Sequence, residues 1–244
     1  VVYKLKEIYR KLSVPQFTIV TGLIIIVFGT LILSSPLCSS SDVGLWEAFF
    51  TSTSAITVTG LTIIDVGVDL NIFGQIFLAL MLLSGGLGLM AITTFLQGFV
   101  VKGTQLRTRL DKGKTLDEFG VGGIGRTFQS IAITATSIIS FGAIVLYFFG
   151  FLDIQNNWQR LWSAIFHSIS AYNNAGFSLW SNSLQDYRSN FVVNVVFIFL
   201  IVMGGLGWRV IDDIWSNRKN LSYKKLSLHS RLVIRTSFSL IIFG

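Results

Sequence analysis

The sequence predicts an all-α membrane protein made of repeated units. Each unit has a long apolar helix, a short helix, a polar loop and a second long apolar helix. Of its 244 residues, 52% are hydrophobic and only 13% are charged, and the mean hydropathy is +0.67. A soluble domain of this length could not bury so much apolar side chain, so we expect a lipid bilayer to be the solvent. An internal sequence repeat indicates that this helix–loop–helix unit occurs more than once.

The repeat consists of segment 48–61, which recurs as segment 164–177. The matched residues are Ala48 with Ala164, Phe50 with Phe166, Ser52 with Ser168, Ser54 with Ser170, Ala55 with Ala171, and Gly60 with Gly176. Trp46 precedes the first copy as Trp162 precedes the second, and Gly-Gly-Leu-Gly follows each copy, at 85–88 and 204–207. Matches at a nearly fixed offset indicate that one structural unit is repeated.

The first unit is predicted over 17–101, after a basic tail, 1–16. With its flanks, the apolar run 17–33 is long enough for a membrane span. A signal peptide is the competing interpretation, and we disfavour it because equally apolar segments follow. A short helix at about 46–57, a polar loop and an apolar run at 72–101 complete the unit, and the glycines of that run would let another element approach closely.

The second unit is predicted over 127–208, between two polar connections, 102–126 and 209–231. Its expected parts are a span at 127–152, a short helix at 158–172 capped by Asn156 or Asn157, and a span at 191–208. The glycines of 102–126 suggest a phosphate-binding loop, but the dinucleotide and P-loop spacings are absent, so we interpret it as a linker or docking loop. The run 232–244 is the expected start of a third unit.

The basic residues predict the orientation. All of the 19 lysines and arginines except Arg160 and Arg188 lie in 1–16, 102–126 and 209–235. Such residues concentrate in cytoplasmic segments, so we expect a cytoplasmic N-terminus, cytoplasmic loops 102–126 and 209–231, and short helices that enter from the outer face. The outer loops are acidic, which would raise the local cation concentration. The juxtamembrane position of the positive charge is explained by topology and lipid rather than by nucleic acid.

The polar ends of the two repeat copies form the candidate site. Non-helical backbone at membrane depth is tolerated only where it is buried in protein or lines a water-filled cavity. The C-termini of short helices carry partial negative charge there and favour a cation. The backbone carbonyls of an extended segment can replace the water shell of the ion. Glycine tolerates the backbone angles that such a segment requires. The predicted ion-binding residues, acting through backbone carbonyls, are Thr57, Val58, Thr59, Gly60, Asn173, Asn174, Ala175 and Gly176.

Other conspicuous residues are interpreted structurally. Helix packing is the expected role of Gly85, Gly86, Gly88, Gly204, Gly205 and Gly207. Bonding to local backbone is the expected role of Ser52, Ser54, Ser168 and Ser170, and His167 is expected to be a structural hydrogen-bonding residue. The lone Cys38 excludes an internal disulfide and a CxxC metal site. An enzyme is not indicated, because the sequence has no intramembrane carboxylate pair, Cys/His cluster or nucleophile–base spacing.

At these residues the sequence resembles the Ktr/Trk/HKT superfamily of potassium and sodium transporters. The resembling segments are 53–61, 166–177 with its Asn-Asn-Ala-Gly-Phe element, and the two Gly-Gly-Leu-Gly clusters. The resemblance covers nearly the whole chain. It is closest to the bacterial KtrB branch, because the chain starts just before its first span, without the extra leading helices expected of the TrkH branch.

The resemblance implies four such repeats around one pseudo-symmetric ion pore, in a multi-pass protein of the plasma membrane. It implies a homodimer on a cytoplasmic ring of nucleotide-binding, KtrA-like regulatory subunits, with loops 102–126 and 209–231 facing the ring. No cofactor is expected on this chain, because the nucleotide belongs to the ring. In this superfamily glycine at the filter position goes with potassium and a serine in the first repeat goes with sodium. Gly60 and Gly176 therefore imply K⁺ as the transported ion, with Na⁺ possible.

The expected function is potassium uptake through a filter of backbone carbonyls, gated by the regulatory subunit. The sequence departs from the family pattern, because it holds only two complete repeats and the start of a third. The last apolar run stops at Gly244 before it could cross the membrane, which favours a truncated chain over a half-transporter that must pair. The alternatives are a sodium or mixed-cation transporter of the same superfamily, and a non-conducting membrane assembly subunit.

Overall fold

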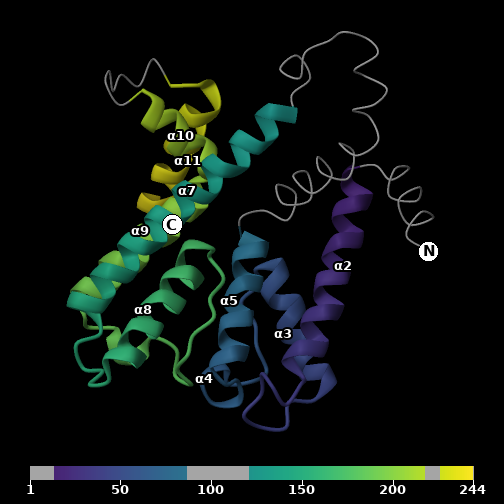
Figure 1. Ribbon diagram of the computed structural model, residues 1–244. Helices are drawn as coiled ribbons and strands as arrows, with labels where there is room; N and C mark the ends of the chain where they lie inside the picture. Colours follow the sequence, from purple (N-terminus) through teal and green to yellow (C-terminus); the bar gives the residue numbers. More distant parts are fainter. Residues whose placement is uncertain (1–13, 87–120, 218–225, 244) are drawn as a thin grey trace. The chain divides into compact units, whose positions relative to one another are not determined.

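The computed structural model describes residues 14–86, 121–217 and 226–243 (Figure 1). Within these residues the regular structure is helical, apart from one isolated β-bridge between Ser39 and Leu70. The predicted all-α class is therefore confirmed for the described part of the chain. Two compact units are present, Val1–Ser130 and Ile131–Gly244, and the division falls within one long helix.

The first unit is built around a short helix. Its helices are α2 (Val14–Leu33), α3 (Leu45–Thr57), α4 (Val66–Asp69) and α5 (Ile72–Gly86). The short helix α3 packs against both α2 and α5 (Figure 1). It begins at Leu45, where the Gly44 N–H donates to the Glu47 carboxylate at 2.8 Å. Its buried face is mostly small, with Ala48, Ser52 and Ala55 among its residues, and small residues let neighbouring helices approach closely.

The connections on one side of this unit hold the ends of α2 and α5 together. The Asn71 N–H donates to the Cys38 carbonyl at 3.0 Å, and the Asn71 side-chain amide donates to the Leu37 carbonyl at 2.8 Å. Gly74 lies so close to the Cys38 carbonyl that any side chain there would overlap it. Cys38 lies just beyond α2 as a buried free cysteine.

The second unit also contains a short helix that packs against an apolar one. Its helices are the part of α7 (Val121–Val145) from Ile131 onward, the π-helical turn η2 (Leu146–Gly150), α8 (Asn157–Tyr172), the 3₁₀ turn η3 (Gln185–Tyr187), α9 (Phe191–Leu206), α10 (Trp208–Ser216) and α11 (Leu228–Phe243). The short helix α8 packs against α9 and η2. Asn156 caps α8, because its side-chain oxygen accepts from the N–H groups of Trp158 and Gln159, which confirms one of the two predicted caps.

Two predicted loops are partly helical. Helix α7 starts at Val121, inside the predicted connection 102–126, while α10 and the first turn of α11 occupy much of the predicted connection 209–231. The charged residues of 209–231 predict a loop, but in α10 apolar and charged residues fall on opposite faces of a helix, and such a helix needs only one apolar face. The tail 1–13, the segment 87–120 with Gly88, the segment 218–225 and Gly244 lie outside the described residues.

One helical stretch among the described residues, Gln129–Gly150, is long and apolar enough to cross a membrane. Three shorter helical stretches are also apolar, namely Thr18–Leu33, Ile72–Gly86 and Phe191–Leu206. Of the predicted span 72–101, residues 72–86 form α5, and residues 87–101 lie outside the described part of the chain. Helix α2 exposes a row of large apolar side chains, including Ile19, Leu23, Val27 and Leu31, and a surface of this kind needs an apolar neighbour.

Candidate functional site

The first loop, defined here as residues 57–61, follows α3 and turns sharply. Val58 is left-handed, with φ 54° and ψ 42°, and Gly60 has φ 82°. The Thr59 N–H donates to the Ser54 carbonyl at 2.9 Å, and the Leu61 N–H donates to the Ser54 hydroxyl at 2.9 Å. The loop is therefore held to the last turn of α3 at two points, on either side of Gly60.

The second loop, defined as residues 173–177, follows α8 along the same path. Asn174 is left-handed with φ 56°, and Gly176 has φ 73°. The Ala175 N–H donates to the Ser170 carbonyl at 2.8 Å, and the Ser170 hydroxyl donates to the Phe177 carbonyl at 2.7 Å. Gly60 and Gly176 thus both have positive φ angles, which glycine tolerates, at matched positions of the two loops.

The carbonyl oxygens of both loops lack hydrogen-bond donors among the described residues. Among the described residues, no N–H or O–H group donates to the carbonyls of 57–60 or of 173–176. The amide groups of the same loops, in contrast, largely donate back to the short helices. Each loop therefore holds four consecutive carbonyl acceptors to which no group in the described part of the chain donates, and such acceptors suit water or a cation.

Two of the predicted packing glycines lie directly behind the loops. A Cβ added to Gly85 would lie 2.5 Å from the Ile56 carbonyl oxygen, and a Cβ added to Gly204 would overlap the Tyr172 carbonyl. This confirms packing roles for Gly85 and Gly204, at the ends of α3 and α8. Gly207 is a correction, because it has φ 79° with nothing close to its Cβ position, and it separates α9 from α10 instead.

The four predicted serines divide into two pairs. Ser54 and Ser170 bond to the loop backbone, as expected. Ser52 and Ser168 do not, because their hydroxyls are buried without a hydrogen-bond partner within the described residues. Both members of this second pair are 0% exposed. The Thr51 hydroxyl, beside Ser52, is likewise buried and without a partner there.

His167 is a structural hydrogen-bonding residue, as predicted. It is 1% exposed. Its Nδ1 donates to the Ser163 carbonyl at 2.8 Å, so its Nε2 is the acceptor for the Ser178 hydroxyl at 3.1 Å. Its ring stacks on Trp180, with 4.0 Å between ring centroids. His167 thereby fixes the chain that follows the second loop.

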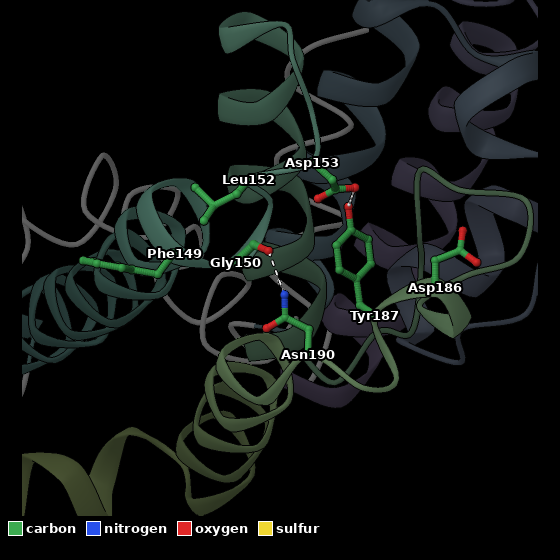
Figure 2. A pocket seen from close by; sticks show the side chains of 7 residues that line it. All are labelled: Phe149, Gly150, Leu152, Asp153, Asp186, Tyr187 and Asn190. Atoms are coloured by element: carbon green, nitrogen blue, oxygen red, sulfur yellow. Dashed lines mark hydrogen bonds between the residues drawn. The ribbon is translucent and has the colours of Figure 1, made fainter.

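A pocket of about 320 Å³ lies at another place in the second unit (Figure 2). Its lining residues are Phe149, Gly150, Leu152, Asp153, Asp186, Tyr187 and Asn190. The Tyr187 hydroxyl donates to Asp153 at 2.6 Å, and the Asn190 amide donates to the Gly150 carbonyl at 3.1 Å (Figure 2). Burial and the Asp153 carboxylate raise the pKa of Tyr187, which keeps the phenol a neutral donor. These polar groups bond one another, and no group of metal-ligating side chains is found in the described part of the chain.

The family follows from comparison with known proteins. A family model described as TrkH, a cation transport protein, matches residues 16–243. The chain belongs to the TrkH family. TrkH proteins are membrane transporters rather than enzymes, so the predicted membrane location and the resemblance to the Ktr/Trk/HKT superfamily are confirmed at this level.

Three relatives show how much of a TrkH protein the chain represents. It is 33% identical over 221 residues to Ktr system potassium uptake protein B of Bacillus subtilis, covering 90% of this chain and 48% of the relative. It is 30% identical over 232 residues to Ktr system potassium uptake protein B of Vibrio alginolyticus, covering 94% and 50%. It is 31% identical over 242 residues to the potassium/sodium uptake protein NtpJ of Enterococcus hirae, covering 98% and 52%. The chain spans about half the length of these relatives.

Sequence reasoning missed two features of the site. It did not predict the left-handed Val58, because β-branched residues rarely adopt positive φ and valine gives no local signal for it. It also did not predict that Ser52 and Ser168 lack partners, since their spacing from Ser54 and Ser170 suggested one shared role. Asn174, in contrast, carries a signal, because asparagine tolerates the left-handed region.

Proposed function

We propose that this chain supplies two segments, 57–60 and 173–176, to the carbonyl filter of a potassium uptake protein. The single observation that supports this most is the pair of matched loops, each with four carbonyl oxygens that accept no hydrogen bond from the described residues. Potassium filters use rings of such carbonyls to replace the ion's hydration shell. The positive φ of Gly60 and Gly176 lets the backbone take this path without a Cβ penalty.

The short helices support the same proposal electrostatically. Both α3 and α8 end at the loops, so the partial negative charge of each helix C-terminus lies beside the free carbonyls. No basic residue occupies the last turn of either helix to oppose a cation. A cation at the loops would therefore be favoured by both helices, whereas an anion would be repelled.

The remaining architecture is proposed on the same basis. The helix–loop–helix units would be repeated around one pore in the complete protein, with the N-terminus and the basic segments 102–126 and 209–231 in the cytoplasm. Such a protein would act as a homodimer, and a cytoplasmic nucleotide-binding ring would gate it at these basic segments. The chain itself would need no cofactor, because the transported ion is its only ligand.

The test is ion uptake in cells that lack their own potassium uptake systems, with the protein expressed from its complete gene. Gly60→Ser should lower the preference for K⁺ over Na⁺ by about tenfold, since a side chain at φ 82° distorts the carbonyl path. Gly44→Ser is the matched control, because Gly44 has φ −66° and caps α3, where serine is favourable. An unchanged ion preference in Gly60→Ser would contradict the filter assignment.

A mixed potassium and sodium transporter is the second candidate. It is supported by the similarity to a relative whose name specifies potassium/sodium uptake. Competition between Rb⁺ and Na⁺ for uptake by the wild-type protein distinguishes the two candidate functions. Uptake of Rb⁺ that excess Na⁺ does not inhibit indicates a potassium filter, whereas comparable competition by the two ions indicates a mixed one.

A further inference from the structure

One serine in each short helix makes two hydrogen bonds to the loop that follows, one through its backbone carbonyl and one through its hydroxyl. In the first unit the Ser54 carbonyl accepts from the Thr59 N–H and the Ser54 hydroxyl accepts from the Leu61 N–H, each at 2.9 Å. In the second unit the Ser170 carbonyl accepts from the Ala175 N–H at 2.8 Å. The Ser170 hydroxyl donates to the Phe177 carbonyl at 2.7 Å. In both units the positive-φ glycine lies between the two bonded residues.

We propose that Ser54 and Ser170 are the positioning residues of the two filter segments and thereby determine ion preference. This proposal rests on the proposed carbonyl filter. A carbonyl filter discriminates between ions only while its oxygens keep their number and spacing, and a positive-φ glycine leaves its own peptide groups easy to rotate. The bonds from one serine fix the residues before and after that glycine, so the free carbonyls between them keep their directions.

The two serines act with opposite hydrogen-bond roles, and this predicts unequal effects. Removing the Ser54 hydroxyl leaves the Leu61 N–H without a partner at a residue that is 59% exposed, where water can replace the bond. Removing the Ser170 hydroxyl leaves the Phe177 carbonyl without a partner at a residue that is only 3% exposed. An unsatisfied buried acceptor is costly, so the second loop should move more than the first.

The chain offers a matched control for each serine. Ser52 and Ser168 lie two positions earlier on the same helices, are equally buried, and have hydroxyls without a partner in the part of the chain that the structure describes. Replacing a partnerless buried hydroxyl with a hydrogen should be nearly neutral. Each serine can therefore be compared with its control: Ser54→Ala with Ser52→Ala, and Ser170→Ala with Ser168→Ala. Both substitutions of a pair remove a buried hydroxyl, but only the first of each pair removes a hydrogen bond to the loop.

The experiment measures K⁺ and Na⁺ uptake per molecule for the protein expressed from its complete gene, together with its amount in the membrane. The K⁺ over Na⁺ preference should fall roughly 3- to 10-fold in Ser170→Ala and by a smaller factor in Ser54→Ala. Ser52→Ala and Ser168→Ala should match the wild type. Ser170→Thr keeps the hydroxyl and should restore the preference. If its extra methyl prevents folding, Ser170→Cys, a weaker donor, should give an intermediate preference.

The outcomes separate this proposal from the proposed function. A wild-type protein without selective cation uptake would overturn the filter itself. A selective wild type whose Ser54→Ala and Ser170→Ala variants keep the same preference per molecule as their controls would overturn only the positioning role. A loss of membrane protein in Ser170→Ala with unchanged preference would also overturn it, because it would show a purely structural serine.

Discussion

In the first loop a valine occupies the left-handed position, whereas in the second loop an asparagine does. The residues behind the loops differ as well. Thr51 in α3 has a buried hydroxyl without a partner among the described residues, but His167, at the matched position in α8, bonds to Ser163 and Ser178 and stacks on Trp180. Yet Gly60 and Gly176 have similar φ angles, 82° and 73°.

The comparison of the two loops separates the interactions that determine the backbone path from those that only support it. The features common to both loops are the bonds to Ser54 or Ser170 and the close approach of Gly85 or Gly204 behind the short helix. We expect these shared contacts to determine the shared path. The histidine and its aromatic neighbours occur only in the second unit, so they add stiffness there. We therefore expect the first loop to be the more deformable of the two.

The largest effect is expected at Gly204. Gly204→Ala would force the new methyl group into the Tyr172 carbonyl, so α8 and α9 would have to separate, and overpacking of this kind costs about 1–3 kcal/mol or more. Its neighbour Gly205 is the control, because a Cβ there would meet only the Asn174 amide nitrogen at 4.0 Å. The apparent melting temperature of the purified protein should fall sharply in Gly204→Ala and little in Gly205→Ala. Equal melting temperatures would show that the close contact is not a constraint.

The next effect tests the support that is specific to the second loop. His167→Ala removes three hydrogen bonds and the stacking on Trp180 and leaves a cavity, so it should lower stability by about 2–4 kcal/mol. Thr51→Val at the matched position removes only a partnerless hydroxyl while keeping the shape, and it should be neutral or slightly stabilising. Denaturation of both variants in one detergent compares them. A destabilising Thr51→Val would mean that the two units are supported alike.

The smallest effect tests the left-handed residues. Val58→Asn should stabilise the first loop by about 1 kcal/mol, because asparagine tolerates φ 54° better than a β-branched residue does. Asn174→Val should destabilise the second loop by a similar amount for the same reason. Measuring both melting temperatures gives two shifts of opposite sign. Shifts of the same sign would show that side-chain packing, rather than backbone strain, distinguishes the loops.

The sequence predicted the short helices closely. The predicted helices 46–57 and 158–172 agree with the observed Leu45–Thr57 and Asn157–Tyr172. A repeated pattern of small and hydroxyl residues defines both helices locally, and an asparagine cap also marks the start of the second. Gly60 and Gly176 have positive φ, in line with the expectation that their backbone angles favour glycine. The filter role of the eight residues stays a prediction. The local sequence did not predict the left-handed conformation of Val58, because that conformation depends on hydrogen bonds to α3. It also did not reveal α10, because the charges of that segment suggested a loop.

The central claim is that the free carbonyls of 57–60 and 173–176 coordinate the transported cation. The most direct measurement is a structure of the complete protein in Tl⁺ or Rb⁺, in which anomalous scattering locates the ions. We expect ion density within coordination distance of carbonyl oxygens in both loops. Ions located only elsewhere, with the loop carbonyls bonded to protein donors, would contradict it.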